Sequence, residues 1–163
     1  MTFCIVLLMI FTAVTGVTDA AEWKREVAAE SHWFEDLPPD ATVIDDDGNI
    51  HMVYGTGRLY YQVGYVSGKT TEIVVDNSPG SGKRAVLALD NEGDPMIAYW
   101  DNTMDQLKFT WREGGVWQFT HLDSGQGVGE YCTMKTDSQG QPHIAYSNGL
   151  HDRLMYTWLD GDI

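Results

Sequence analysis

Cysteine and positive charge are both scarce in this chain. Among its 163 residues only Cys4 and Cys132 are cysteines, and no CxxC pair occurs. This excludes a disulfide framework and a cysteine-based metal site. Lys and Arg number 10 against 24 Asp and Glu, which gives a net charge of -14. Because so acidic a surface repels phosphate backbones and anionic lipids, we expect neither nucleic acid nor a membrane surface as a partner.

Long hydrophobic runs are also missing, apart from residues 2–14 (TFCIVLLMIFTAV). A membrane-spanning helix needs about 20 apolar residues, whereas this shorter run has the length of a signal-peptide core. Small residues follow it, so we expect residues 1–21 to be a cleaved signal peptide and the mature protein to be secreted, either extracellular or periplasmic. No Lys or Arg precedes the apolar core. An uncleaved anchor and a mis-started reading frame are therefore the alternatives.

The motifs of the common catalytic and metal sites are absent as well. The sequence contains no P-loop, no G-x-S-x-G elbow and no zincin histidine pair. Residues 45–49 (DDDGN) have the oxygen density of a calcium loop but lack the distant bidentate Glu, so we interpret them as a polar turn. No pair of carboxylates is singled out by its spacing. The sequence thus predicts no catalytic residue, no metal site and no cofactor.

What the chain does contain is a repeat. Residues 137–146 read DSQGQPHIAY, residues 90–99 read DNEGDPMIAY, and residues 45–54 read DDDGNIHMVY. In each copy Asp and Gly favour a turn, and the alternating residues that follow favour a strand. The glycines are Gly48, Gly93 and Gly140, so the repeat recurs after 45 and then 47 residues. A period of this length is typical of repeat architectures.

The middle repeat predicts four short antiparallel strands. They cover residues 85–90, 95–100, 106–112 and 116–123, with Gly114-Gly115 as the last hairpin. Four such strands form the blade of a β-propeller. We therefore predict an all-β chain of about three four-stranded antiparallel β-propeller blades. The repeat region, residues 22–163, divides into units of about 22–66, 67–113 and 114–163, in the strand order fourth, first, second, third.

The repeated D-x-x-G-x-P-x-I-A-Y, followed by L-x-Y/F and later by G-x-W, resembles the blades of secreted sialidase-like propellers. It is also similar to the repeats of bacterial propeller lectins, which bind sugars between blades. The sialidase Asp box has one residue between Asp and Gly, whereas this chain has two, and none of its arginines lies in the family's first-arginine motif. The resemblance thus implies the architecture and a carbohydrate ligand, but no catalytic residue.

The loop after the second strand of a unit is the predicted ligand site. It reads Trp100-Asp101-Asn102 in the middle unit and contains Asn148 in the last one. An exposed indole beside polar side chains suits the apolar face and the hydroxyls of a sugar. The alternative is structural: Trp100 packs on a neighbouring blade and Asp101 stabilises a turn. His51 and His143, which share a repeat position, are interpreted as packed, hydrogen-bonded strand residues rather than ligands.

Two expectations concern packing. The first is that the following residues, three of them tryptophans, are buried in the core: Ile97, Tyr99, Leu107, Phe109, Trp111, Trp117, Ile144, Tyr146, Leu154, Tyr156 and Trp158. The second is incompleteness, because the last unit has no fourth strand after Trp158. Trp23 stands 22 residues before Asp45, much as Trp117 stands 20 before Asp137. Residues 22–29 are therefore expected to form a fourth strand that pairs beside residues 154–158, most simply in a six-bladed homodimer, unless further blades belong to a longer chain.

The sequence as a whole favours a secreted, non-catalytic binding or scaffold module with a glycan as the leading ligand class. One alternative is a fragment of a sialidase-like or other glycoside-processing propeller whose catalytic residues lie elsewhere. Another is a purely structural repeat assembly.

Overall fold

The computed structural model describes residues 38–55 and 57–159, all within the compact unit Ser31–Ile163. The expected signal peptide and the expected strand at Trp23 lie outside the described residues. Within them the chain is all β, apart from a short 3-10 turn, η1 (Gly149–His151). None of the described segments is a helix long and apolar enough to cross a membrane.

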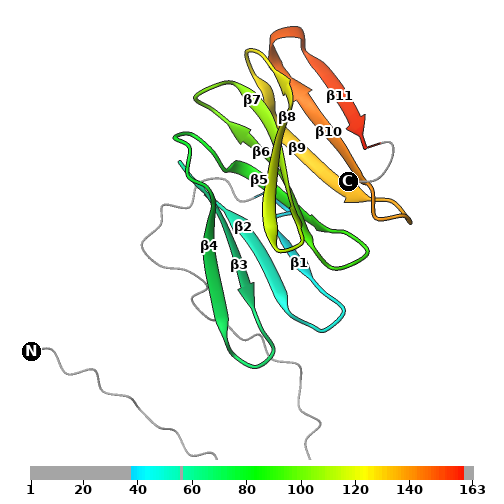
Figure 1. Ribbon diagram of the computed structural model, residues 1–163. Coiled ribbons are helices and arrows are strands. Elements are labelled where there is room, and N and C mark those ends of the chain that lie inside the picture. Colours follow the sequence, from blue (N-terminus) through cyan, green and yellow to red (C-terminus); the bar gives the residue numbers. More distant parts are fainter. Residues whose placement is uncertain (1–37, 56, 160–163) are drawn as a thin grey trace, which may run out of the picture. The chain divides into compact units, whose positions relative to one another are not determined.

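The described residues form eleven strands in three antiparallel sheets, and within each sheet the strands follow one another in chain order (Figure 1). The first sheet holds β1 (Thr42–Ile44), β2 (Ile50–Tyr54), β3 (Leu59–Gly64) and β4 (Thr70–Asp76). The second holds β5 (Lys83–Leu89), β6 (Pro95–Asp101), β7 (Gln106–Glu113) and β8 (Val116–Ser124). Within the described residues the third sheet holds β9 (Val128–Thr136), β10 (Pro142–Asn148) and β11 (Arg153–Trp158). The predicted antiparallel all-β class is thus confirmed.

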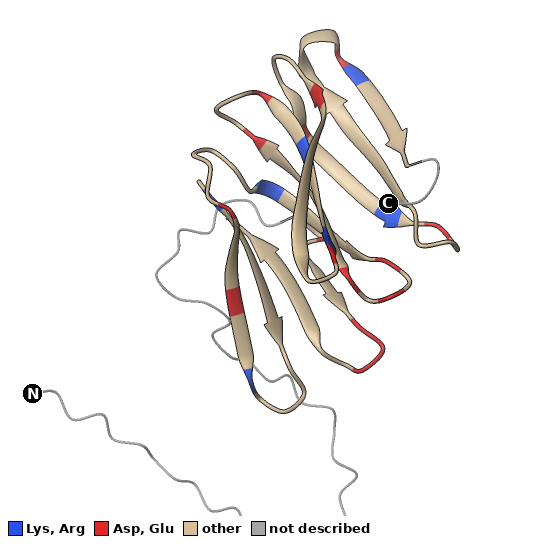
Figure 2. Ribbon diagram, in the orientation of Figure 1, with Lys and Arg blue, Asp and Glu red and all other residues tan. Residues whose placement is uncertain are grey.

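The repeated Asp and Gly build the same turn in each sheet. Asp90 Oδ1 accepts hydrogen bonds from the backbone amides of Glu92 and Asp94, at 2.9 and 2.8 Å. Gly93 has a φ of +82°, a backbone conformation that glycine adopts without strain. Asp137 does the same in the third sheet, where hydrogen bonding, first of all from the Gln141 amide, lowers its pKa. Figure 2 shows that acidic residues gather at these turns.

The second sheet lies between the other two and is buried on both faces. Successive residues of β5 and β6 alternate between two cores: Ala85, Leu87, Ile97 and Tyr99 contribute to the core shared with the first sheet. Val86, Ala88, Met96 and Ala98 contribute to the core shared with the third sheet. This arrangement explains why the β6 sequence, PMIAYW, is apolar almost throughout.

Two glycines at matching positions let the sheets approach closely. A Cβ on Gly82 would lie 2.8 Å from the Cα of Leu59, and one on Gly129 would lie 2.9 Å from the Cα of Leu107. Each glycine comes just before or within the first strand of its sheet and contacts the third strand of the preceding sheet. The sheets therefore pack on one another in the same way at both interfaces.

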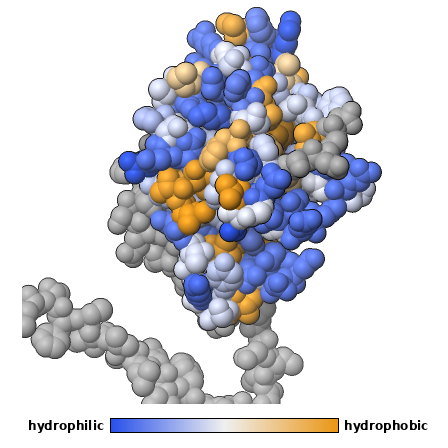
Figure 3. All heavy atoms as spheres, viewed as in Figure 1, coloured by the Kyte–Doolittle hydropathy of each residue, from blue (hydrophilic) through white to orange (hydrophobic). Residues whose placement is uncertain are grey.

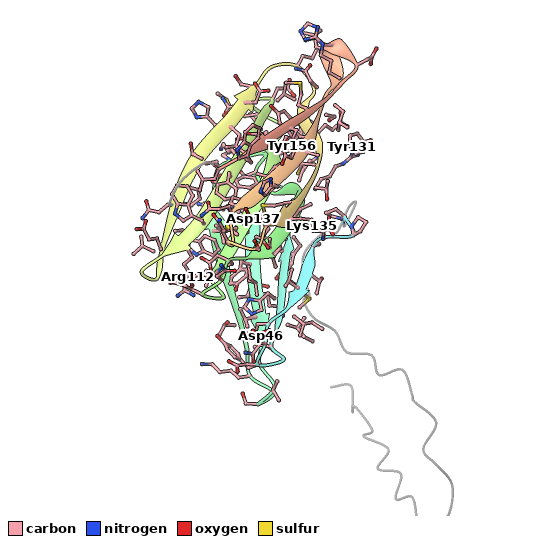
Figure 4. All side chains as sticks on the ribbon, turned by 90° about the vertical axis from the view of Figure 1, so that its right-hand side faces the viewer. Asp46, Arg112, Tyr131, Lys135, Asp137 and Tyr156 are labelled. Atoms are coloured by element: carbon pink, nitrogen blue, oxygen red, sulfur yellow. The ribbon has the colours of Figure 1, made fainter. Side chains whose placement is uncertain are left out.

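The core prediction is correct for the inner sheet faces and wrong for the outer face of the third sheet. Ile97, Tyr99, Leu107, Phe109, Ile144 and Tyr146 are buried as predicted, and Trp111 and Trp117 pack against the cores while partly exposed. By contrast, Leu154 is 83% exposed, Tyr156 56% and Trp158 54%. Their counterparts in β3 and β7 are covered by the next sheet, whereas no sheet in the described part of the chain covers β11. Figure 4 turns this side toward the viewer and labels Tyr156 on it.

Candidate functional site

The predicted loop residues lie where β6 and β10 end. Asp101 is only 1% exposed, and its Oδ1 accepts hydrogen bonds from the backbone amides of Thr103 and Met104. Its Oδ2 lies 2.7 Å from the Nζ of Lys108. Asp101 thus stabilises the turn and forms an ion pair with a partly buried lysine, which is the structural role considered as the alternative.

The other three loop residues are placed differently. Asn102 is exposed, whereas Trp100 and Asn148 are partly buried. The Nε1 of Trp100 and the Oδ1 of Asn148 are both buried and have no hydrogen-bond partner in the part of the chain that the structure describes. Among the described residues, no hydrogen bond or ion pair links these three side chains to one another. Their role in ligand binding therefore stays a prediction.

Both strand histidines have structural partners. His51 contacts the hydroxyl of Tyr61 and lies 3.1 Å from a carboxylate oxygen of Asp45. His143 makes the matching contact with Tyr156. Each ring therefore ties its second strand to its third strand, as the sequence predicts. Burial raises the pKa of the Cys132 thiol to about 12, so this thiol is protonated and unreactive at neutral pH.

A polar cleft lies between the second and third sheets, at the opposite end of β6 from Trp100. Its volume is about 340 Å³. Three turns form its walls: the β5–β6 turn, the β7–β8 hairpin and the β9–β10 turn. Its lining residues are mainly polar: Asp90, Asn91, Glu92, Asp94, Trp111, Arg112, Glu113, Gly114, Gln139, Gly140 and Gln141.

Two of these lining residues carry unpaired polar atoms. Among the described residues, the buried Nε1 of Trp111 and Oε1 of Gln141 have no hydrogen-bond partner. Trp111 comes from β7 of the second sheet, whereas Gln141 directly precedes β10 of the third. The two residues that carry an unpaired donor and an unpaired acceptor thus line the same cleft from two sheets.

The cleft is held in shape by close contact between two turns. Gly140 is buried, and a Cβ there would lie 2.9 Å from the Cγ and from the backbone nitrogen of Asn91. The β9–β10 turn can therefore approach the β5–β6 turn only because residue 140 lacks a side chain. The walls are preformed by backbone packing, as is usual for small-ligand sites.

An apolar groove of about 300 Å³ continues from the cleft along the same two sheets, and Trp111 lines both. Its other walls include Phe109, Leu122, Ile144 and Trp158. Hydrophobic residues also reach the surface as patches between hydrophilic regions in the view of Figure 3.

The chain matches no protein-family model and no curated protein. Its function is therefore inferred from its own residues. In the described part of the chain, no group of three or more His, Cys, Asp or Glu could hold a metal ion. The chemistry that the cleft offers is hydrogen bonding beside an indole ring.

The sequence did not single out this cleft. The sequence predicted a core position for Trp111 from its strand periodicity and assigned no role to Gln141. The sequence distinguishes these two residues only by their positions in the repeat. Gln141 directly precedes the repeated proline, and Trp111 lies shortly before the hairpin at Gly114-Gly115.

Proposed function

We propose that this chain is a secreted, non-catalytic binding module built of propeller-type blades, and that it binds a glycan in the polar cleft between the second and third sheets. The blade assignment is supported by the 45- to 47-residue repeat and by the four-stranded antiparallel sheets that pack face to face in chain order. Secretion is supported by the apolar run at residues 2–14.

The unpaired Trp111 Nε1 and Gln141 Oε1 carry the glycan proposal. Leaving a buried polar group without a partner costs roughly 1–3 kcal/mol, which a suitable ligand recovers. A sugar hydroxyl both donates and accepts, so neighbouring hydroxyls can pair with an indole N–H and an amide oxygen at once. The volume of about 340 Å³ is at the small end of ligand pockets and suits one or two sugar rings.

Several acidic residues lie at the cleft. Asp90, which lines it, and Asp137, in the neighbouring β9–β10 turn, each use one oxygen to hold turn amides. Glu92, Asp94 and Glu113 also line the cleft, and glycoside hydrolysis requires two carboxyl groups that act together on the scissile bond. We propose binding rather than hydrolysis, and the aryl-glycoside assay below distinguishes the two.

A saccharide array followed by titration calorimetry tests the proposal. We expect a saturable sugar ligand, and we expect Trp111→Phe and Gln141→Leu each to weaken its binding about tenfold, since each removes a hydrogen bond worth about 1.4 kcal/mol. Trp100→Phe is the matched control, because it removes the other unpaired indole N–H at the opposite end of β6. Its affinity should change less than about twofold, within the ±0.5 kcal/mol expected of a remote substitution.

The other outcomes identify the alternatives. Weaker binding in Trp100→Phe alone would transfer the site to the predicted loop of Trp100, Asp101, Asn102 and Asn148. No sugar ligand at all would favour the purely structural repeat. Release of the aglycone from aryl glycosides by the purified chain would favour the glycoside-processing alternative.

A further inference from the structure

The interface between the first two sheets is closed by a tryptophan from a fourth strand. Trp117, in β8, packs edge-on against Tyr61 of β3 with ring centroids 5.5 Å apart, and it joins the core between these sheets. In the ladder between β7 and β8, Trp117 pairs with Arg112.

Among the described residues, the second interface has no tryptophan from a fourth strand. Leu107 and Leu154 occupy the place of Leu59 in their sheets, so Phe109 is the counterpart of Tyr61 and Leu159 is the counterpart of Arg112. Phe109 and Leu159 both line the apolar groove of about 300 Å³. The groove therefore lies where the third sheet would place the tryptophan of a fourth strand.

The β11 edge of the third sheet can accept that strand. Among the described residues β11 pairs with β10 alone, so within this part of the chain its other edge is open to a further strand. The groove beside it is mainly apolar, with Trp111, Leu122, Ile144 and Trp158 among its walls.

The chain itself contains a segment that fits. In residues 22–29, EWKREVAA, Trp23 stands at nearly the same distance from its repeat Asp as Trp117 does. The segment precedes the first sheet in the chain, and the first and third sheets pack on opposite faces of the second. In a closed ring of blades the first sheet of one copy follows the third sheet of the other, so a segment that precedes the first sheet in the chain can complete the third sheet of that other copy.

The two outer faces of the stack also expose apolar side chains. The third sheet exposes Leu154, Tyr156 and Trp158, and the first exposes Ile44, Ile50 and Val74. The first three occupy positions that a following sheet covers elsewhere in this chain. The last three lie on the face of the first sheet that points away from the second, as the ladder pairs Ile44–Ile50 and Tyr60–Val74 place them.

We propose that the apolar groove and the free edge of β11 form the docking site for residues 22–29 of a second copy of this chain, with Trp23 in the groove. The exchange is mutual, so two copies complete each other's third sheet and close a two-fold assembly of six sheets. Known propeller rings use about four to eight blades, so six is an ordinary number whereas three is too few. This docking is independent of what the polar cleft binds.

Light scattering on the full chain at micromolar concentration tests the docking. We expect a dimer, and we expect Trp23→Ala and Leu159→Asp each to weaken dimerisation at least tenfold. Trp33→Ala is the matched control, because Trp33 has no counterpart in the repeat, and it should leave the dimer intact. A wild-type monomer, or equal effects of Trp23→Ala and Trp33→Ala, would overturn the proposal.

A complementation experiment separates docking between copies from docking within one chain. Trp23→Ala keeps an intact groove and Leu159→Asp keeps an intact docking segment. Mixing the two variants, one of them isotope-labelled, should therefore give heterodimers in native mass spectrometry in excess of either homodimer. The absence of such an excess, with both variants folded by circular dichroism, would contradict exchange between copies.

Discussion

Asp76 illustrates how this acidic chain uses a buried carboxylate. Its side chain accepts hydrogen bonds from the Ser78 amide, the Ser81 hydroxyl and the Tyr99 hydroxyl, at 2.8 to 2.9 Å, and it lies 3.4 Å from Lys108 Nζ. Burial alone would raise its pKa, but these hydrogen bonds outweigh burial and lower the pKa to about 2. The ionised carboxylate thus joins β4 of the first sheet to β6 and β7 of the second.

This lowered pKa predicts an acid-sensitive contribution to stability. Because the folded-state pKa lies below the unfolded value, Asp76 stabilises the fold above about pH 4, and the contribution disappears as pH falls toward 2. For a shift of this size the loss is roughly 2 kcal/mol. Urea unfolding of the wild type and of Asp76→Asn between pH 2 and 6 should therefore give a difference that shrinks with decreasing pH. A constant difference across this range would contradict the assignment.

At the scale of the element, the glycine at the start of β9 lets two sheets pack closely. Gly129 has a φ of +75°, and its added Cβ would meet the Cα of Leu107. Gly129→Ala should cost roughly 2–5 kcal/mol, which combines the strain of a left-handed residue with overpacking against backbone. Gly93→Ala is the control, since its φ is +82° but nothing lies within 4 Å of its added Cβ. Equal losses for the two variants in chemical denaturation would show that packing adds nothing.

The elements were predictable from sequence because their causes are local. Asp90 and Gly93 specify a turn by themselves, and the alternation of Leu107, Phe109 and Trp111 specifies a strand. Exposure is not local: Leu154 and Leu107 have matching sequence contexts, and they differ only in whether a following sheet covers them. For the same reason the polar cleft could not be predicted, since Trp111 and Gln141 face it from different sheets. The sequence predicted Asp101 in a loop, but it could not show that Asp101 is buried, because the lysine that pairs with it, Lys108, comes from the next strand.

At the scale of the whole molecule, stability should depend on what covers the third sheet. Leu107 is fully buried between two sheets of one chain, whereas its counterpart Leu154 is 83% exposed. Leu107→Ala should therefore destabilise the fold by about 2–5 kcal/mol at every protein concentration. Leu154→Ala should cost less than about 0.5 kcal/mol in dilute solution, as an exposed substitution does, and more once a second copy covers the residue.

Thermal unfolding over a range of protein concentrations measures this difference. Association stabilises the folded state by mass action, so the wild-type midpoint should rise with concentration. Leu154→Ala should flatten that rise, because it removes apolar contact only from the assembled state. Leu107→Ala should lower all midpoints while leaving the rise in place, since its contacts lie within one chain. A wild-type midpoint that does not change with concentration would mean that the exposed face of β11 stays uncovered in solution.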